Sequence, residues 1–271
     1  MVFDYFLLFA VGLIGGFLAG LIGIGGGVMY VLVLPYLILQ MGFPESEIVQ
    51  YTIANSLVGT MFAALAGNIV LIRQGVFPWK EVLLVGFWAA TAAIMLLKFF
   101  VNTEYYQVQQ FNVAVIALMV FIIYRTLRQN LKKTATAEEK KVENWAYAMV
   151  GGAAGAVSAL SGLGGGTIII PMLNSGFNIS IKKAKSISLG VICLTSFGLS
   201  VINFFETPAS SYQNQSHGYI IIPLALIVSL GVIIGSPFGV KVAHKLSNRI
   251  ISLIFVLFVV VVIIDKLCQL I

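Results

Sequence analysis

Two glycine clusters are the residues of this chain whose spacing best suits chemistry. Gly23-Ile24-Gly25-Gly26-Gly27 and Gly162-Leu163-Gly164-Gly165-Gly166 share one pattern. Glycine lacks a Cβ, so the backbone can leave helical geometry and another group can approach closely. An interrupted helix exposes free N–H groups and a partial positive charge at its N-terminal end, which suits an anion. Both clusters are therefore predicted to bind an anion through their backbone.

Hydroxyl and amide side chains follow each cluster. Thr52, Asn55 and Ser56 lie within about one helical turn, and Ser186 and Ser188 lie close together in the second half. Such donors can bind an oxyanion without placing a permanent charge in lipid. Hydrogen bonding between helices explains the same residues equally well. The substrate-binding residues that we predict are Gly25, Gly26, Gly27, Asn55, Ser56, Gly164, Gly165, Gly166 and Ser188.

Earlier glycines have a simpler explanation. Gly12, Gly15, Gly16 and Gly20 recur at near-helical spacing. Small residues at this spacing let membrane helices approach closely. We therefore predict that these four glycines serve packing, whereas three successive glycines in each half exceed what packing needs.

The composition indicates the environment of these residues. Of 271 residues, 59% are hydrophobic and only 10% are charged, with a mean hydropathy of +1.01. A soluble domain carries roughly a quarter charged residues, so the chain is predicted to be a multi-pass membrane protein with no sizeable soluble domain. The net charge of +6 is read as basic cytoplasmic loops rather than nucleic-acid binding. Cys193 and Cys268 lack partners at metal-ligand spacing, so no metal site or cofactor is predicted.

The apolar runs form two similar halves. Four runs precede and four follow a charged stretch, and the glycine clusters lie in the first and fifth runs. Gly12 and Gly16 align with Gly151 and Gly155 at the same offset. We therefore predict an internal duplication. Its parts are a first transmembrane repeat over 1–127, a cytoplasmic linker over 128–143 and a second transmembrane repeat over 144–271.

The first and fifth runs are too long for one crossing. As a helix, Phe3 to Gln40 would extend roughly 57 Å against a hydrocarbon core of about 30 Å. If each long run crosses once, nine basic residues fall inside and seven outside, with Lys80 and Lys183 on opposite sides. If each run is a hairpin that turns at its glycines, fourteen fall inside and only Lys98 and Lys266 fall outside. Because cytoplasmic loops are enriched in Lys and Arg, we predict the hairpins.

The predicted fold is accordingly an all-α polytopic membrane protein. Each half is a glycine-broken helical hairpin plus three spanning helices, and this odd number of crossings inserts the halves in opposite orientations. Inverted repeats with helices interrupted near the midplane are a recurring architecture of secondary transporters. The segments are nearly free of charge, and a neutral site rich in donors suits an anion better than Na⁺ or H⁺.

An enzyme is the other class considered. Ser161 beside the glycine-rich turn, with His217 and His244 elsewhere, could form the serine and histidine pair of an intramembrane protease. Both histidines lie in polar or basic stretches that read as loops, so this alternative is disfavoured. The sequence has no phosphate-binding loop of the Gly-x-x-x-x-Gly-Lys type, which argues against an ATP-driven pump within this chain.

Three motifs resemble the sulfite exporter TauE/SafE family across essentially the whole chain. They are Gly20 to Gly27, Ser158 to Gly166 with Pro171 after it, and Gly235-Ser236-Pro237-Phe238-Gly239. The resemblance implies a transporter of the inner (plasma) membrane for sulfite, sulfoacetate or related sulfur-containing anions. The expected function is export of such an anion by rocking of the two halves. Proton-coupled anion uptake is the alternative, and oligomeric state is not predicted.

Overall fold

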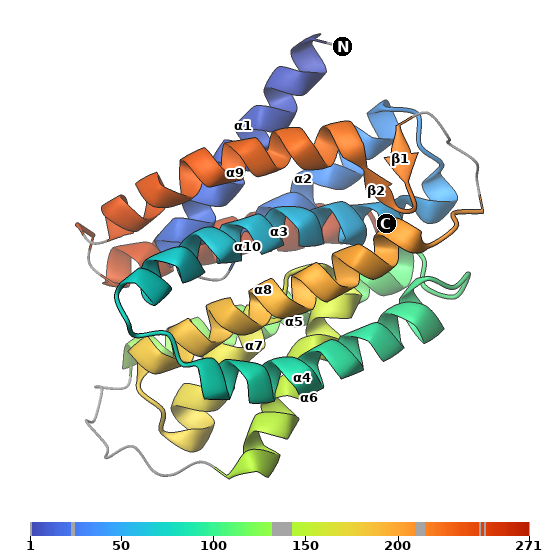
Figure 1. Cartoon of the computed structure of the whole chain (residues 1–271). Coiled ribbons are helices and arrows are strands. Elements are labelled where there is room, and N and C mark those ends of the chain that lie inside the picture. The colour runs from blue at the N-terminus through green and yellow to red at the C-terminus, as the bar shows by residue number, and fades with distance from the viewer. Residues whose placement is uncertain are drawn as a thin grey trace.

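The part of the chain that the structure describes consists of helices joined by short connections, with one β-hairpin. The computed structural model describes residues 2–22, 25–131, 143–209, 215–243, 245–246 and 248–270. The predicted all-α class is confirmed (Figure 1). The elements are α1 (Val2–Ile22), α2 (Gly27–Gln40), the 3₁₀-helix η1 (Glu45–Glu47), α3 (Ile48–Arg73), α4 (Trp79–Leu96), the π-helix η2 (Leu97–Val101), α5 (Val108–Leu131), α6 (Asn144–Ser161), α7 (Gly166–Pro171), the π-helix η3 (Met172–Gly176), α8 (Ile181–Phe205), β1 (Ser216–His217), β2 (Ile220–Ile221), α9 (Ile222–Ala243) and α10 (Asn248–Cys268).

Six of the described helical segments are long and apolar enough to cross a membrane. Their exposed surfaces carry large apolar side chains such as Leu83, Phe87 and Leu226, which lipid rather than water can cover. The chain is therefore a multi-pass membrane protein, as its composition predicts. The six segments are Tyr5–Ile22, Glu45–Arg73, Trp79–Val101, Val108–Arg125, Ile181–Phe205 and Ile222–Ala243.

Both long apolar runs turn back at their glycines. A Cβ on Gly26 would lie 2.9 Å from the carbonyl oxygen of Gly15 and 3.4 Å from Ala19 Cβ, so the chain after the break returns along α1. Gly165 likewise lies against the carbonyl group of Ala154 in α6. These contacts confirm the predicted hairpins α1/α2 and α6/α7.

One ion pair and one hydrogen bond define one end of the bundle. Lys183 Nζ at the start of α8 lies 2.9 Å from Glu81 Oε1 at the start of α4, so both helices begin at the same end. This pair excludes the single-crossing arrangement, which puts these starts on opposite sides. Arg125 of α5 reaches the same region, donating to Pro171 O at 2.9 Å. We call this the basic end; its cations include Arg73, Lys80, Arg125, Lys182, Lys183, Lys185, Lys241 and Lys245.

The opposite end is acidic. Glu47 accepts hydrogen bonds from Ala209 N at 2.9 Å and Tyr219 Oη at 3.1 Å, which joins the α2/α3 and α8/α9 connections. Burial, together with the Glu47 charge, raises the pKa of Tyr219, so its hydroxyl stays a donor. Gln50 Nε2 donates to Val101 O at 2.9 Å and adds the α4/α5 connection. We call this the acidic end; its carboxylates include Glu45, Glu47, Glu104 and Glu206.

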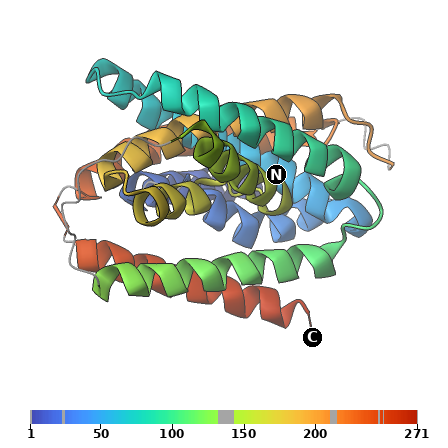
Figure 2. The same cartoon turned by 90° about the horizontal axis from the view of Figure 1, so that it is seen from below.

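The long helices lie side by side in the order α9, α3, α8, α4 across Figure 1, and each neighbouring pair is in contact. Figure 2 shows α5 and α10 paired on the far side of the bundle, with the blue and olive hairpin helices between them and this layer. The short helices α2 and α7 pack against α3 and α8, respectively. The glycine breaks of both hairpins thus lie between these two layers.

Glycines allow the closest helix contacts. The positions of Gly12, Gly16 and Gly20 in α1 face the backbone of Val228, Val232 and Ser236 in α9 so closely that a Cβ would collide. Gly15 instead meets the ring of Tyr30, 2.6 Å from where its Cβ would be. The predicted packing role of these four α1 glycines is confirmed. In the second half, Gly151 and Gly155 of α6 meet the backbone of α4 in the same way.

Candidate functional site

The two glycine clusters break their helices through left-handed backbone. Gly25 and Gly26 have φ of 84° and 51°, and Gly164 and Gly165 have φ of 77° and 73°. Residues with a Cβ rarely adopt this conformation. Glycine is therefore needed at both breaks for the backbone itself, besides any close approach.

The breaks meet at the contact between α3 and α8. A Cβ on Gly25 would lie 3.1 Å from Thr60 Cγ2 and 3.6 Å from Ile192 Cγ2. One on Gly164 would lie 2.8 Å and 2.9 Å from the same two methyl groups. Gly27 also faces Leu163 Cα at 2.9 Å from its Cβ position. We call this meeting point, formed by Gly25–Gly27 and Gly162–Gly166 around Thr60 and Ile192, the glycine junction.

Backbone donors at the junction are free. Among the described residues, the backbone N–H groups of Gly25, Gly26, Gly164 and Gly165 have no hydrogen-bond acceptor. The Gly27 amide differs, because it donates to Gly25 O across a tight turn. Buried backbone N–H groups are nearly always paired, so free ones indicate a place where another acceptor can bind.

Two of the predicted side chains lie at the junction but already have partners. Ser56 Oγ donates to Gly162 O at 2.9 Å, and Ser188 Oγ donates to Gly166 O at 3.5 Å. Both serines are fully buried. These hydrogen bonds hold the second break against α3 and α8. The two serines therefore act as the sequence analysis expected if such residues serve hydrogen bonding between helices.

Asn55 points away from the junction. Its Nδ2 donates to Tyr51 O at 2.7 Å and to Tyr219 O at 3.0 Å, while its Oδ1 accepts from Ile221 N at 3.0 Å. These bonds tie α3 to the β1/β2 hairpin at the acidic end. Every polar atom of the side chain is therefore used in the fold, and the structure does not bring Asn55 together with the other predicted residues.

Two residues that the sequence reasoning missed face the junction with free hydroxyl groups. Thr60 Oγ1 lies 3.1 Å from the Cβ position of Gly27, and Ser196 Oγ lies 3.4 Å from that of Gly164. Both residues are fully buried, and neither hydroxyl has a partner. Helical spacing could have identified them. Thr60 follows Ser56 by about one turn and Ser196 follows Ser188 by about two, so each lies on the same helix face as a predicted serine.

The junction offers donors without charge. The side chains that the structure places there are hydroxyls and aliphatic groups from α3 and α8, together with the free amides of the breaks. A buried cation would need carboxylates or converging carbonyl oxygens, whereas an oxyanion needs N–H and O–H donors. The arrangement is suited to an oxyanion.

The serine and histidine pair is not assembled from the residues described. Ser161 Oγ donates to Val157 O at 2.6 Å and accepts from Leu163 N at 3.3 Å. His217 is exposed at the acidic end, where its ring stacks on Phe204 at 4.0 Å between centroids. His244 lies outside the described residues. The two groups that can be placed are thus bound to other partners.

Comparison with known proteins agrees with the geometry. The profile of the family described as sulfite exporter TauE/SafE matches residues 8–265. The chain belongs to this family. A probable membrane transporter protein of Methanocaldococcus jannaschii is 30% identical over 90% of this chain and 88% of its own length. Probable membrane transporter proteins of Haemophilus influenzae and Bacillus subtilis are 26% and 24% identical, covering 94% and 99% of this chain and 95% and 97% of their own lengths.

Membership of the TauE/SafE family defines the class of the protein. It is a membrane transporter that acts on a small molecule across a lipid bilayer. The family and these relatives favour transport over catalysis.

Proposed function

We propose that the protein is a secondary transporter of small sulfur-containing anions, with sulfite or an organosulfonate as substrate and export as its direction. The observation that carries this proposal is the convergence of free amides from both breaks with the unpartnered hydroxyls of Thr60 and Ser196. Three or four neutral donors around one point can replace the hydration of an oxyanion without trapping it. Gly25–Gly27 and Gly164–Gly166 would supply the backbone donors.

Helix pairing supports an inverted repeat as the basis of alternating access. Helix α1 packs along α9 of the other half, and α6 packs along α4 in the same way. Helices α3 and α8 pair with each other, as do α5 and α10. Each contact between the halves therefore has an equivalent when the halves are exchanged, as a two-fold relation requires. In this proposal the repeats 1–127 and 144–271 rock about the junction, which is buried from both ends.

The charges at the two ends support an orientation. Positive-inside bias would place the basic end in the cytoplasm and the acidic end outside the inner membrane. An inside-negative voltage then drives an anion outward by about 2.3 kcal/mol per charge per 100 mV. Export needs no further energy source under these conditions.

Sulfite flux in proteoliposomes under an imposed voltage tests this function, with sulfoacetate and sulfate as competitors. We expect voltage-dependent sulfite flux, and about tenfold weaker apparent affinity in Thr60→Val, because a hydrogen bond to an anion is lost. Thr91→Val is the matched control, since Thr91 is exposed on α4 and donates to Phe87 O within its own helix.

Three outcomes would contradict the proposal. Unchanged affinity in Thr60→Val would remove Thr60 from the site. Absence of flux for every sulfur oxyanion would overturn the substrate class. Flux driven by a pH gradient and indifferent to voltage would instead support proton-coupled uptake.

A further inference from the structure

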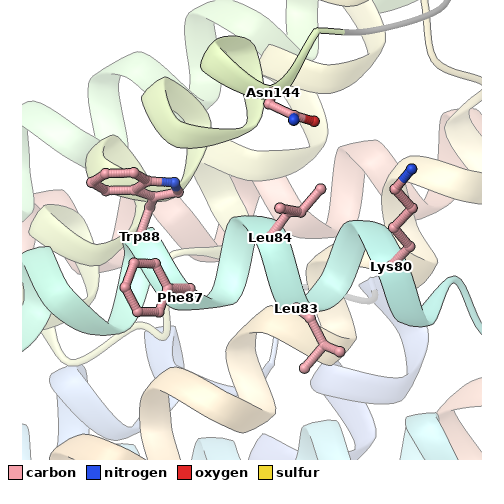
Figure 3. Close-up of a pocket in the computed structure, with 6 residues that line it drawn as sticks. All are labelled: Lys80, Leu83, Leu84, Phe87, Trp88 and Asn144. Carbon is pink, nitrogen blue, oxygen red and sulfur yellow. The ribbon is translucent and has the colours of Figure 1, made fainter.

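An open groove lies on the outer surface between α4 and α6, apart from the glycine junction. It has a volume of about 350 Å³ and is lined by Lys80, Leu83, Leu84, Phe87, Trp88 and Asn144. We call it the α4–α6 groove. Figure 3 shows Trp88 and Phe87 toward one end, Lys80 at the other, the two leucines between them, and Asn144 on the facing helix above Leu84. The groove therefore has an apolar length and a polar mouth.

Helix geometry explains why this groove exists. Gly151 and Gly155 of α6 press against the backbone of Val85 and Ala89 in α4, which is the closest approach of the two helices. Asn144 begins α6 about two turns before Gly151. The helices separate between these positions, toward the basic end. Trp88 packs beside Gly151 and closes the inner end of the groove.

The walls of the groove are suited to a hydrocarbon chain. Leu83 is 59% exposed and Phe87 is 65% exposed, although both lie within a membrane-spanning segment. Apolar surface of this kind is covered by acyl chains when the helix is in a bilayer. A groove of this volume is large enough for part of one acyl chain.

The mouth of the groove is suited to a phosphate group. Neither Lys80 nor Asn144 has a hydrogen-bond or ion-pair partner among the described residues. The two carboxylates next to them in sequence have other partners: Glu81 pairs with Lys183 at 2.9 Å, and Glu143 accepts a hydrogen bond from Trp145 Nε1 at 2.7 Å. The Lys80 ammonium is thus available to an anion, and the Asn144 amide on the facing helix can donate to an anionic oxygen.

We propose that the α4–α6 groove binds a phospholipid with an anionic headgroup, its phosphate at Lys80 and Asn144 and one acyl chain along Leu83 and Phe87 toward Trp88. Charge complementarity favours this occupant, because the mouth opens at the basic end and anionic lipids attract basic segments at a membrane surface. The site is independent of the transported substrate.

Trp88 provides a direct reporter. The other tryptophans, Trp79 and Trp145, are exposed and can be replaced by Phe, which leaves Trp88 as the sole tryptophan. The protein is placed in phosphatidylcholine nanodiscs, and phosphatidylglycerol or phosphatidylcholine with brominated chains is added in increasing mole fraction. We expect brominated phosphatidylglycerol to quench Trp88 at about fivefold lower mole fraction than brominated phosphatidylcholine.

Two lysine variants decide the assignment. Lys80→Gln should abolish the preference for phosphatidylglycerol, while Lys98→Gln, an exposed lysine near the acidic end, should leave it intact. An unchanged melting temperature of both variants checks that they are folded. Equal quenching by the two lipids in the parent protein would overturn the proposal and identify the occupant as bulk lipid. A preference that survives Lys80→Gln would also overturn it.

Discussion

The two glycine breaks have the same backbone geometry but differ in how they are held. The second break receives side-chain hydrogen bonds from both long helices, through Ser56 to Gly162 O and Ser188 to Gly166 O. Within the described residues, the first break at Gly25–Gly27 receives none, and the nearby Tyr30 hydroxyl is buried without a partner. The second break is therefore held more firmly than the first, and in the proposed transporter the first break would be the side that adjusts around a substrate.

The helices α3 and α8, which face the two breaks, also differ in the side chains that they present. At matching positions α3 offers the hydroxyl of Thr60, whereas α8 offers the aliphatic Ile192. One turn further along α8, Ser196 restores a donor next to Gly164. The junction is therefore symmetric in its backbone but asymmetric in its side chains, and substrate selectivity would depend on the side chains.

The largest expected effect comes from filling each break. In Gly165→Val the new Cβ collides with the carbonyl group of Ala154 at φ of 73°, so we expect about 3–5 kcal/mol loss of stability. In Gly26→Val the new Cβ meets Gly15 O at 2.9 Å and the Tyr30 hydroxyl at 3.3 Å, which are longer contacts than at Gly165, so its loss should be about 1–2 kcal/mol smaller. Both variants should lose anion binding.

Thermal unfolding in detergent compares the two variants, with Gly152→Ala as the control because a Cβ there meets nothing within 4 Å. Equal losses of stability in the two variants would show that both breaks are held equally firmly.

An intermediate effect is expected at Asn55, whose side-chain hydrogen bonds join α3 to the β1/β2 hairpin. Asn55→Leu leaves Tyr219 O and Ile221 N buried without their partner, so we expect a cost of about 2–4 kcal/mol. The corresponding residue of the second half is Ile187, where Ile187→Val should cost only about 1 kcal/mol. Denaturation measurements compare the two, and sulfite competition in the surviving protein should be unchanged by either. Altered selectivity in Asn55→Leu would return this residue to the binding site.

The smallest expected loss of stability comes from removing the hydroxyl of Ser56 or Ser188. Ser56→Ala removes a hydrogen bond of 2.9 Å and should cost about 1 kcal/mol, while Ser188→Ala removes one of 3.5 Å and should cost a few tenths, roughly 0.3 kcal/mol. Hydrogen exchange at the amides of residues 162–166 measures this local loosening. Faster exchange in Ser188→Ala than in Ser56→Ala would reverse the assignment of the main anchor.

The burial of Lys266 is a feature that its position in the chain does not predict. The predicted topology places this lysine outside the membrane, near the end of the last span. In the structure its side chain is fully buried, with Nζ 3.2 Å from Asp265 Oδ2 and 3.1 Å from Gln269 Oε1. A buried ammonium is tolerated only with such partners. The helices α5 and α10 had to pair before this burial could exist.

The sequence by itself determined the membrane class, the two helix breaks and the hairpins. Each depends on local composition: apolar length, glycines that alone accept left-handed backbone, and basic residues that mark one end. Only the tertiary structure decided that Thr60 and Ser196 face the junction while Asn55 turns to the β-hairpin. The reason is that a helical residue serves whichever distant segment packs on its face, and that segment is chosen by the packing of the whole bundle.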